Sequence, residues 1–161
     1  MASPASIAKH PIHPMLVALP IGLWIFSLVS DVMYLVKWGA VWADVAFYTM
    51  AGGLVGALVA AMPGLVDLLS ISDPKVKKIG IWHMCINLVA VALFAVNLWL
   101  RTTASPGATP PIWLSVIGVV MLGISGWLGG EMVYVHAVAV EPQRGTTTES
   151  ATGREAPRRV A

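Results

Sequence analysis

Four long apolar segments constrain the fold of this chain more than any other feature of its sequence. They cover residues 15–36, 45–69, 79–100 and 112–135, and crossing a bilayer requires about 20 residues of helix. The connections, residues 37–44, 70–78 and 101–111, are short, so consecutive helices should be antiparallel neighbours. The sequence therefore predicts an all-α integral membrane protein in which residues 15–140 form an antiparallel four-helix transmembrane bundle.

The composition excludes most other classes of protein. Hydrophobic residues make up 57% of the chain and charged residues only 11%, whereas soluble domains carry about 25% charged residues. The net charge of +2 provides no basic surface for nucleic acid. A single cysteine, Cys85, excludes a disulfide framework and a multi-cysteine metal site. Outside the bundle we expect an N-terminal His/Pro arm at residues 1–14 and a disordered polar tail at residues 141–161.

The distribution of positive charge predicts the orientation. An even number of spans places both termini and the second connection on one side of the membrane. All but two of the ten lysines and arginines fall on that side, the exceptions being Lys37 and Arg101. Because lysine and arginine accumulate in cytoplasmic loops, both termini are expected to be cytoplasmic. The chain would then be a multi-pass protein of the cell inner (cytoplasmic) membrane, in contact with the lipid bilayer.

Six ionisable residues are expected at this same cytoplasmic end, where odd helices begin and even helices end. Charged groups within a bilayer are costly and are functional candidates by default. Imidazole and carboxylate groups are ligands of zinc, iron and copper, and paired histidines also bind haem. The candidate cofactor ligands are His10, His13, His83 and His136, and a metal site would use His13, His83, His136, Asp67 and Glu131.

The local sequence assigns different roles to these histidines. His10 and His13 both precede prolines, which disfavours helix, so the arm should be extended with Pro14 as the first helical residue. His13 would then lie at the mouth of the first helix, whereas His10 would either join the site or have a surface or arm-anchoring role. His83 lies inside an apolar span and needs a partner.

Two alternatives remain open for the partner of His83. The first is a hydrogen bond to Asp67 or Glu131, and the second is a metal or haem iron. Glu131 and His136 point in different directions on an ideal helix. They share a site only if the helix ends or bulges near Tyr134.

Small residues recur at helical spacing in two spans. Such stripes allow close helix packing in lipid, and they also make room for a flat cofactor. The stripes comprise Gly52, Gly56, Ala60 and Gly64 in the second span, and Gly123, Gly126 and Gly130 in the fourth. Asp31, by contrast, is expected near the outer interface, where it would cap or solvate a helix end.

A weak internal repeat relates the two halves of the chain. His13 opens the first span and Asp67 closes the second, while His83 opens the third and Glu131 closes the fourth. Two helical hairpins would then each supply one histidine and one carboxylate around a pseudo-twofold axis.

The opening motif His10-Pro11-Ile12-His13-Pro14, the Gly64-x-x-Asp67 turn and the closing motif Gly126-Trp-Leu-Gly-Gly-Glu131 resemble those of the bacterial membrane family DUF2231. The resemblance covers about residues 8–140. It implies a four-helix membrane protein without an established activity. The domain is also similar to the membrane part of proteins that carry Rieske-type modules, which implies electron transfer and a Rieske-type partner.

Three functional hypotheses follow. The first is a small membrane redox protein that binds haem b through His83 and either His13 or His136, with Lys75, Lys77 and Lys78 near the propionates. The second is a non-haem iron, zinc or copper site that adds Asp67 and Glu131. The third is an accessory subunit with a polar network and no cofactor. The sequence leaves enzymatic activity and homo-oligomer formation open.

Overall fold

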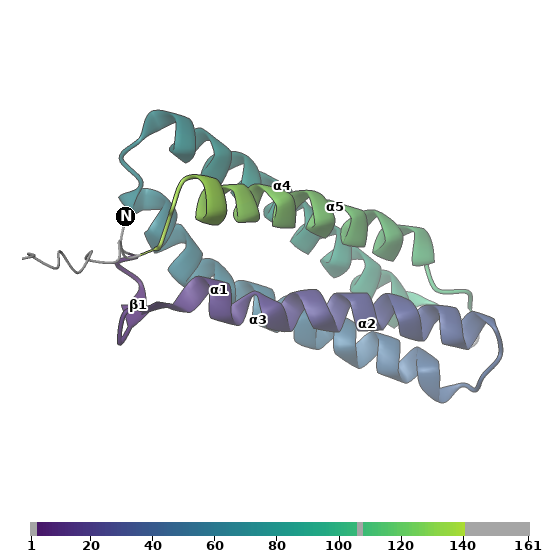
Figure 1. Cartoon of the computed structure of the whole chain (residues 1–161). Helices are drawn as coiled ribbons and strands as arrows, with labels where there is room; N and C mark the ends of the chain where they lie inside the picture. The colour runs from purple at the N-terminus through teal and green to yellow at the C-terminus, as the bar shows by residue number, and fades with distance from the viewer. Residues whose placement is uncertain (1–2, 106–107, 141–161) are drawn as a thin grey trace, which may run out of the picture.

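The computed structural model describes residues 3–105 and 108–140. Four helical segments in it are long and apolar enough to cross a membrane: Ile12–Leu35, Val41–Ser70, Pro74–Thr103 and Ile112–Val135. They are joined at alternate ends, which makes neighbours antiparallel (Figure 1). The predicted four-helix bundle is therefore confirmed. The predicted disordered tail lies outside the described residues.

The first and fourth spans are each built from two helical elements. A short break separates α1 from α2, and a π-helical turn, η1, follows α5. The elements in chain order are β1 (Ser6–Ile7), β2 (His10–Pro11), α1 (Ile12–Leu16), α2 (Ala18–Leu35), α3 (Val41–Ser70), α4 (Pro74–Thr103), α5 (Ile112–Gly130) and η1 (Glu131–Val135). A helix end or bulge near Tyr134 was the condition for Glu131 and His136 to share a site, and the structure has a π-helical bulge there, η1.

The start of the first helix differs from the prediction. Helix begins at Ile12 rather than at residue 15, so His13 lies within α1 and not in an extended arm. The residue before a proline avoids helical geometry when only local sterics act. Here the His13 ring forms a hydrogen bond with the carbonyl oxygen of Ala60 on α3, and this tertiary contact favours the helical position. The arm before it is a small antiparallel hairpin of β1 and β2.

The bundle consists of two helical hairpins packed side by side. The first contains α1, α2 and α3, and the second contains α4, α5 and η1 (Figure 1). Because α2 and α4 each pack against both α3 and α5, α2 and α4 lie diagonally across the bundle. Trp24 of α2 and Phe94 of α4 meet on this diagonal as stacked rings with centroids 4.3 Å apart. They form the buried core together with Met50, Ala90 and Leu122.

Two glycines make room for this aromatic pair. A Cβ atom on Gly53 would lie 2.5 Å from the Trp24 ring, and one on Gly118 would lie 2.6 Å from the Phe94 ring. The stripe predicted on α5 is wrong, because a Cβ atom on Gly123 or Gly126 would meet nothing within 4 Å. Small-residue spacing alone does not distinguish a helix face that packs on protein from one that faces lipid.

Substituting these glycines tests the packing. We expect Gly53→Leu to destabilise the protein by at least about 1–3 kcal/mol, the usual cost of overpacking a core. Gly123→Leu is the matched control, since it adds the same side chain to a helix where the space is open. Thermal unfolding in detergent measures both. Equal melting temperatures for the two variants would show that Trp24 does not pack against Gly53.

A buried ion pair joins the two hairpins at the end where α2 meets α3. The guanidinium of Arg101 donates to both carboxylate oxygens of Asp31, over 2.7 and 2.6 Å. Asp31 is completely buried, so the prediction that it caps or solvates a helix end is wrong. Asn97 accepts a hydrogen bond from Arg101, and Ser115 lies within 3.5 Å of Asp31. We call this the ion-pair end of the bundle.

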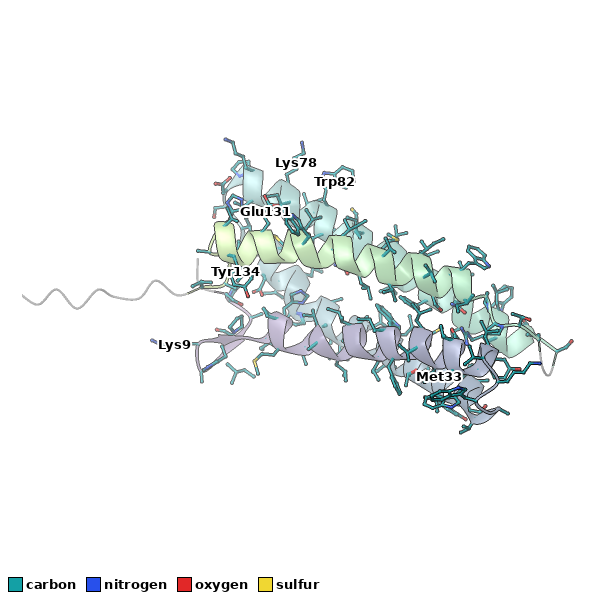
Figure 2. The ribbon with its side chains drawn as sticks, turned by 45° about the vertical axis from the view of Figure 1, so that its right-hand side comes forward. Lys9, Met33, Lys78, Trp82, Glu131 and Tyr134 are labelled. Atoms are coloured by element: carbon teal, nitrogen blue, oxygen red, sulfur yellow. The ribbon has the colours of Figure 1, made fainter. Side chains whose placement is uncertain are left out.

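The opposite end carries the N-terminal hairpin, the start of α4 and η1, and we call it the histidine end. Figure 2 shows Lys9, Lys78, Glu131 and Tyr134 at the histidine end and Met33 at the other. Exposed tryptophans occur near both ends, and an exposed tyrosine occurs near the histidine end, as in the aromatic belts at membrane interfaces. They are Trp82, Trp127 and Tyr134 near the histidine end, and Trp38, Trp99 and Trp113 near the ion-pair end.

Candidate functional site

His13 is held against α3 by a hydrogen bond and a close packing contact. Its Nδ1 atom lies 2.8 Å from the carbonyl oxygen of Ala60. One turn further along α3, a Cβ atom on Gly64 would lie 2.7 Å from the ring. Gly64 is therefore required here because any side chain would displace His13. The predicted small-residue stripe of α3 thus forms the surface on which this imidazole rests.

His83 is held in the same way against α5. Its Nδ1 atom lies 2.9 Å from the carbonyl oxygen of Ser125 and 3.0 Å from the Ser125 hydroxyl oxygen. Gly129, one turn further along, would place a Cβ atom 3.3 Å from the ring. Asn87 donates to the Ser125 hydroxyl over 2.7 Å and to the His83 carbonyl over 2.9 Å. His83 thus has a polar surrounding that His13 lacks.

These contacts determine which ring nitrogen of each histidine carries the proton. A backbone carbonyl only accepts hydrogen bonds, so the Nδ1 atoms of His13 and His83 must be the donors. The lone pair of each neutral imidazole is then on Nε2. Histidines that bind metals generally donate their other ring N–H to a carbonyl or carboxylate in this way. Within the described residues, no hydrogen-bond partner is found for either Nε2.

The two imidazoles face each other across the bundle diagonal. Their ring centroids are 6.4 Å apart and their planes are almost perpendicular, at 87°. A metal ion bound by two imidazole nitrogens at about 2 Å on opposite sides would place the centroids about 6 Å apart. The observed separation is compatible with two ligands of one central ion, and it also lies within the range of a direct edge-to-face ring contact.

The remaining predicted ligands have other surroundings. Asp67 accepts hydrogen bonds from the Ser3 hydroxyl at 2.6 Å and the Ala5 amide at 3.4 Å, which anchors the N-terminal arm. The exposed His10 ring bonds to the carbonyl of Ala8 within that arm, which supports the anchoring alternative. The sequence offered Asp67 and Glu131 as hydrogen-bond partners of His83. Neither is the observed partner, which is Ser125.

Glu131 is the first residue of η1, and His136 directly follows η1. The His136 amide donates to the Glu131 carbonyl over 3.2 Å, but the His136 side chain is exposed. Across residues 3–105 and 108–140, no three or more His, Cys, Asp or Glu side chains form a group that could hold a metal ion. The five predicted metal ligands therefore separate into a facing pair, His13 and His83, and three residues with other surroundings.

Comparison with known protein families identifies the family of this chain. A family model described as "Predicted membrane protein (DUF2231)" matches residues 9–142. The chain belongs to the DUF2231 family. Searches of curated proteins and of solved structures give no significant match.

The internal repeat of this DUF2231 protein is clearest in the contacts across the diagonal. Arg101 follows its partner Asp31 by 70 positions, and the same spacing separates His13 from His83 and Trp24 from Phe94. Each pair meets on the bundle axis. The supporting helices match too, since Gly53, Ala60 and Gly64 of α3 correspond in order and spacing to Gly118, Ser125 and Gly129 of α5.

Sequence reasoning missed the carbonyl groups of Ala60 and Ser125 and the contact of Gly129 with His83. It also missed the partnership of Asp31 with Arg101. The signal that identifies them is the matching spacing of these residues within each helix of the two hairpins. A comparison of flanking residue identity does not reveal it, because matched positions hold different residues, such as Trp24 and Phe94.

Proposed function

We propose that this DUF2231 protein binds one b-type haem between its two hairpins, with His13 and His83 as axial ligands, and transfers electrons within the membrane. The observation that carries the proposal is the facing pair of imidazoles. Both are oriented by Nδ1 hydrogen bonds to backbone carbonyls, and their centroids are 6.4 Å apart. Binding sites built in the core of a four-helix bundle from facing side chains are a recurrent arrangement.

Haem fits these residues better than a non-haem ion. A haem iron receives four ligands from the porphyrin and needs only two from the protein. A free iron, zinc or copper ion usually needs three or four protein ligands, and residues 3–105 and 108–140 contain no such group. The non-haem site is the second candidate, and an accessory role without a cofactor is the third.

The surrounding residues have defined tasks in this proposal. The carbonyls of Ala60 and Ser125 fix the orientation of the two ligand rings and increase their basicity. Bound haem would supply a one-electron carrier. Lys75, Lys77 and Lys78 lie at the start of α4, at the histidine end, where they would neutralise the propionates. In this proposal the histidine end lies on the cytoplasmic side of the bacterial inner membrane, and the bias of lysine and arginine supports that orientation.

The electron partner is proposed on the basis of family resemblance. The domain resembles the membrane part of proteins that carry Rieske-type modules, and a separate Rieske-type protein would complete an electron-transfer chain. Residues 1–161 contain one cysteine, Cys85, which is too few for the two cysteine ligands of a Rieske-type cluster.

Titration of haemin into the purified full-length protein in detergent tests the proposal. We expect saturation at one haem per chain, with a Soret band that sharpens and shifts on reduction. In membrane vesicles, the impermeant reductant dithionite should reduce the haem faster when the cytoplasmic face is outside. Stoichiometric binding of iron, zinc or copper salts without haem binding would favour the non-haem site. Binding of neither would leave the accessory role.

A further inference from the structure

The two halves of the histidine site are unequal in how firmly the backbone holds each ligand. His83 lies in the interior of α4, an uninterrupted helix that begins at Pro74 and is capped by the Asp73 side chain. Several turns of helix therefore support it on both sides. Asn87 and Ser125 add hydrogen bonds around its ring and its carbonyl.

His13 is supported much less. It is the second residue of α1, so only Ile12 precedes it in the helix, whereas the Val17 and Ile21 amides continue the helical hydrogen bonds into α2 after it. Under the repeat spacing, Val17 occupies the position of Asn87, and Ala60 occupies that of Ser125. The first half-site therefore lacks both the amide and the hydroxyl of the second. Its one side-chain hydrogen bond within the described residues joins Nδ1 to the Ala60 carbonyl.

The N-terminal arm is fastened next to the weaker half. The arm is connected to α1 through a hydrogen bond from the Ile12 amide to the Ala5 carbonyl. It is fastened to the end of α3 by Asp67, which accepts from the Ser3 hydroxyl and the Ala5 amide. Moving His13 away from the bundle axis requires release of these contacts, of the hydrogen bond to Ala60 and of the packing on Gly64. Moving His83 requires disruption of a long helix.

From this asymmetry we propose that His83 is the permanent ligand and His13 the exchangeable one, so that a small uncharged diatomic molecule replaces His13 when the arm is released. This inference rests on the proposed haem site. For carbon monoxide and ferrous haem, the iron–Nε2 bond of His13 breaks and an iron–carbon bond forms. No electron is transferred, and the His13 imidazole leaves neutral. The protein then senses or binds a diatomic ligand on the His13 side of the site.

Carbon monoxide binding to the reduced, full-length holoprotein tests the exchange. We expect the Soret band to shift to that of a carbon monoxide complex. His13→Ala should retain haem and bind carbon monoxide at least about tenfold faster, because no internal ligand competes. His83→Ala should lose haem. The proposal would be overturned if His13→Ala lost haem while His83→Ala retained it, or if both variants lost haem equally. Failure of carbon monoxide to bind the wild-type haem would also overturn it.

The arm has its own matched pair of variants. Ser3→Ala removes the hydroxyl that donates to the Asp67 carboxylate, whereas Ser70→Ala removes an exposed hydroxyl that bonds only to the Asp67 backbone carbonyl. We expect Ser3→Ala to accelerate carbon monoxide binding by up to about tenfold, the effect of losing one hydrogen bond to a charged group. Ser70→Ala should leave the rate unchanged. Equal rates in both variants would show that the arm does not control access.

Hydrogen exchange of the haem-free protein separates this inference from the proposed function. Residues 16–21 and 86–91 occupy matching positions in the two halves. We expect the first segment to exchange clearly faster, because its helix begins only at Ile12 and frays from that end, whereas α4 begins at Pro74, well before residue 86. Equal protection would contradict the asymmetry even if haem binds. A protein that binds no haem refutes the proposed function and the exchange with it, whichever segment exchanges faster.

Discussion

Arg101→Met should destabilise this DUF2231 protein by about 3–5 kcal/mol, because it leaves a buried carboxylate without its partner. Asp31 is completely buried and accepts two hydrogen bonds from the Arg101 guanidinium. No other cation pairs with Asp31 within the described residues. The pair also joins α2 of the first hairpin to α4 of the second, so its loss weakens the contact between hairpins. Denaturant unfolding in detergent measures the change.

A double variant separates the charge from the packing. Asp31→Leu combined with Arg101→Met removes both charges together, and replacing a buried ion pair with apolar groups is often neutral or stabilising. We therefore expect the double variant to recover most of the stability that Arg101→Met loses. An Arg101→Met protein that unfolds like the wild type would show that the two side chains do not pair.

His83→Ala should abolish haem binding, which is the largest functional effect that we expect. His83 is the ligand that the uninterrupted helix α4 and the Ser125 carbonyl hold in place. A neighbouring group cannot replace an axial ligand, and changes that act only through a second residue typically cost about 10–100-fold in affinity. The loss of affinity for His83→Ala should exceed that range in a haem titration.

The matched controls are the two histidines outside the facing pair. His10 is exposed on the arm and bonds to Ala8, and His136 is exposed after η1. His10→Ala and His136→Ala should each retain wild-type haem affinity. If His136→Ala lost haem while His83→Ala retained it, the ligand pair proposed here would be wrong.

The sequence was sufficient to predict the bundle but not the rotation of its helices. Apolar length and short connections predict four antiparallel spans whatever the packing, because the bilayer imposes both requirements. Which face of a helix points inward depends on partners far away in the chain. For this reason, the packing of Gly123 and the burial of Asp31 were predicted wrongly, and the contact of Asp31 with Arg101 was not predicted.

The candidate site was predicted in part for the same reason. The topology brought the histidines to one end, and the structure brings His13 and His83 together there. The topology could not predict that Asp67 accepts hydrogen bonds from the arm, because the arm hairpin is a local structure stabilised by its own contacts. The sequence also predicted His13 outside the helix, because a residue before proline disfavours helix. In the structure the hydrogen bond to Ala60 outweighs this weak local preference.

Electron paramagnetic resonance of the oxidised holoprotein tests the central claim most directly. Two neutral imidazoles make ferric haem low-spin, and their nearly perpendicular planes, at 87°, leave two of the iron d orbitals almost equal in energy. We expect one highly anisotropic low-spin signal, with one haem per chain. A high-spin signal would contradict ligation by both His13 and His83. A rhombic low-spin signal would contradict the geometry of this pair.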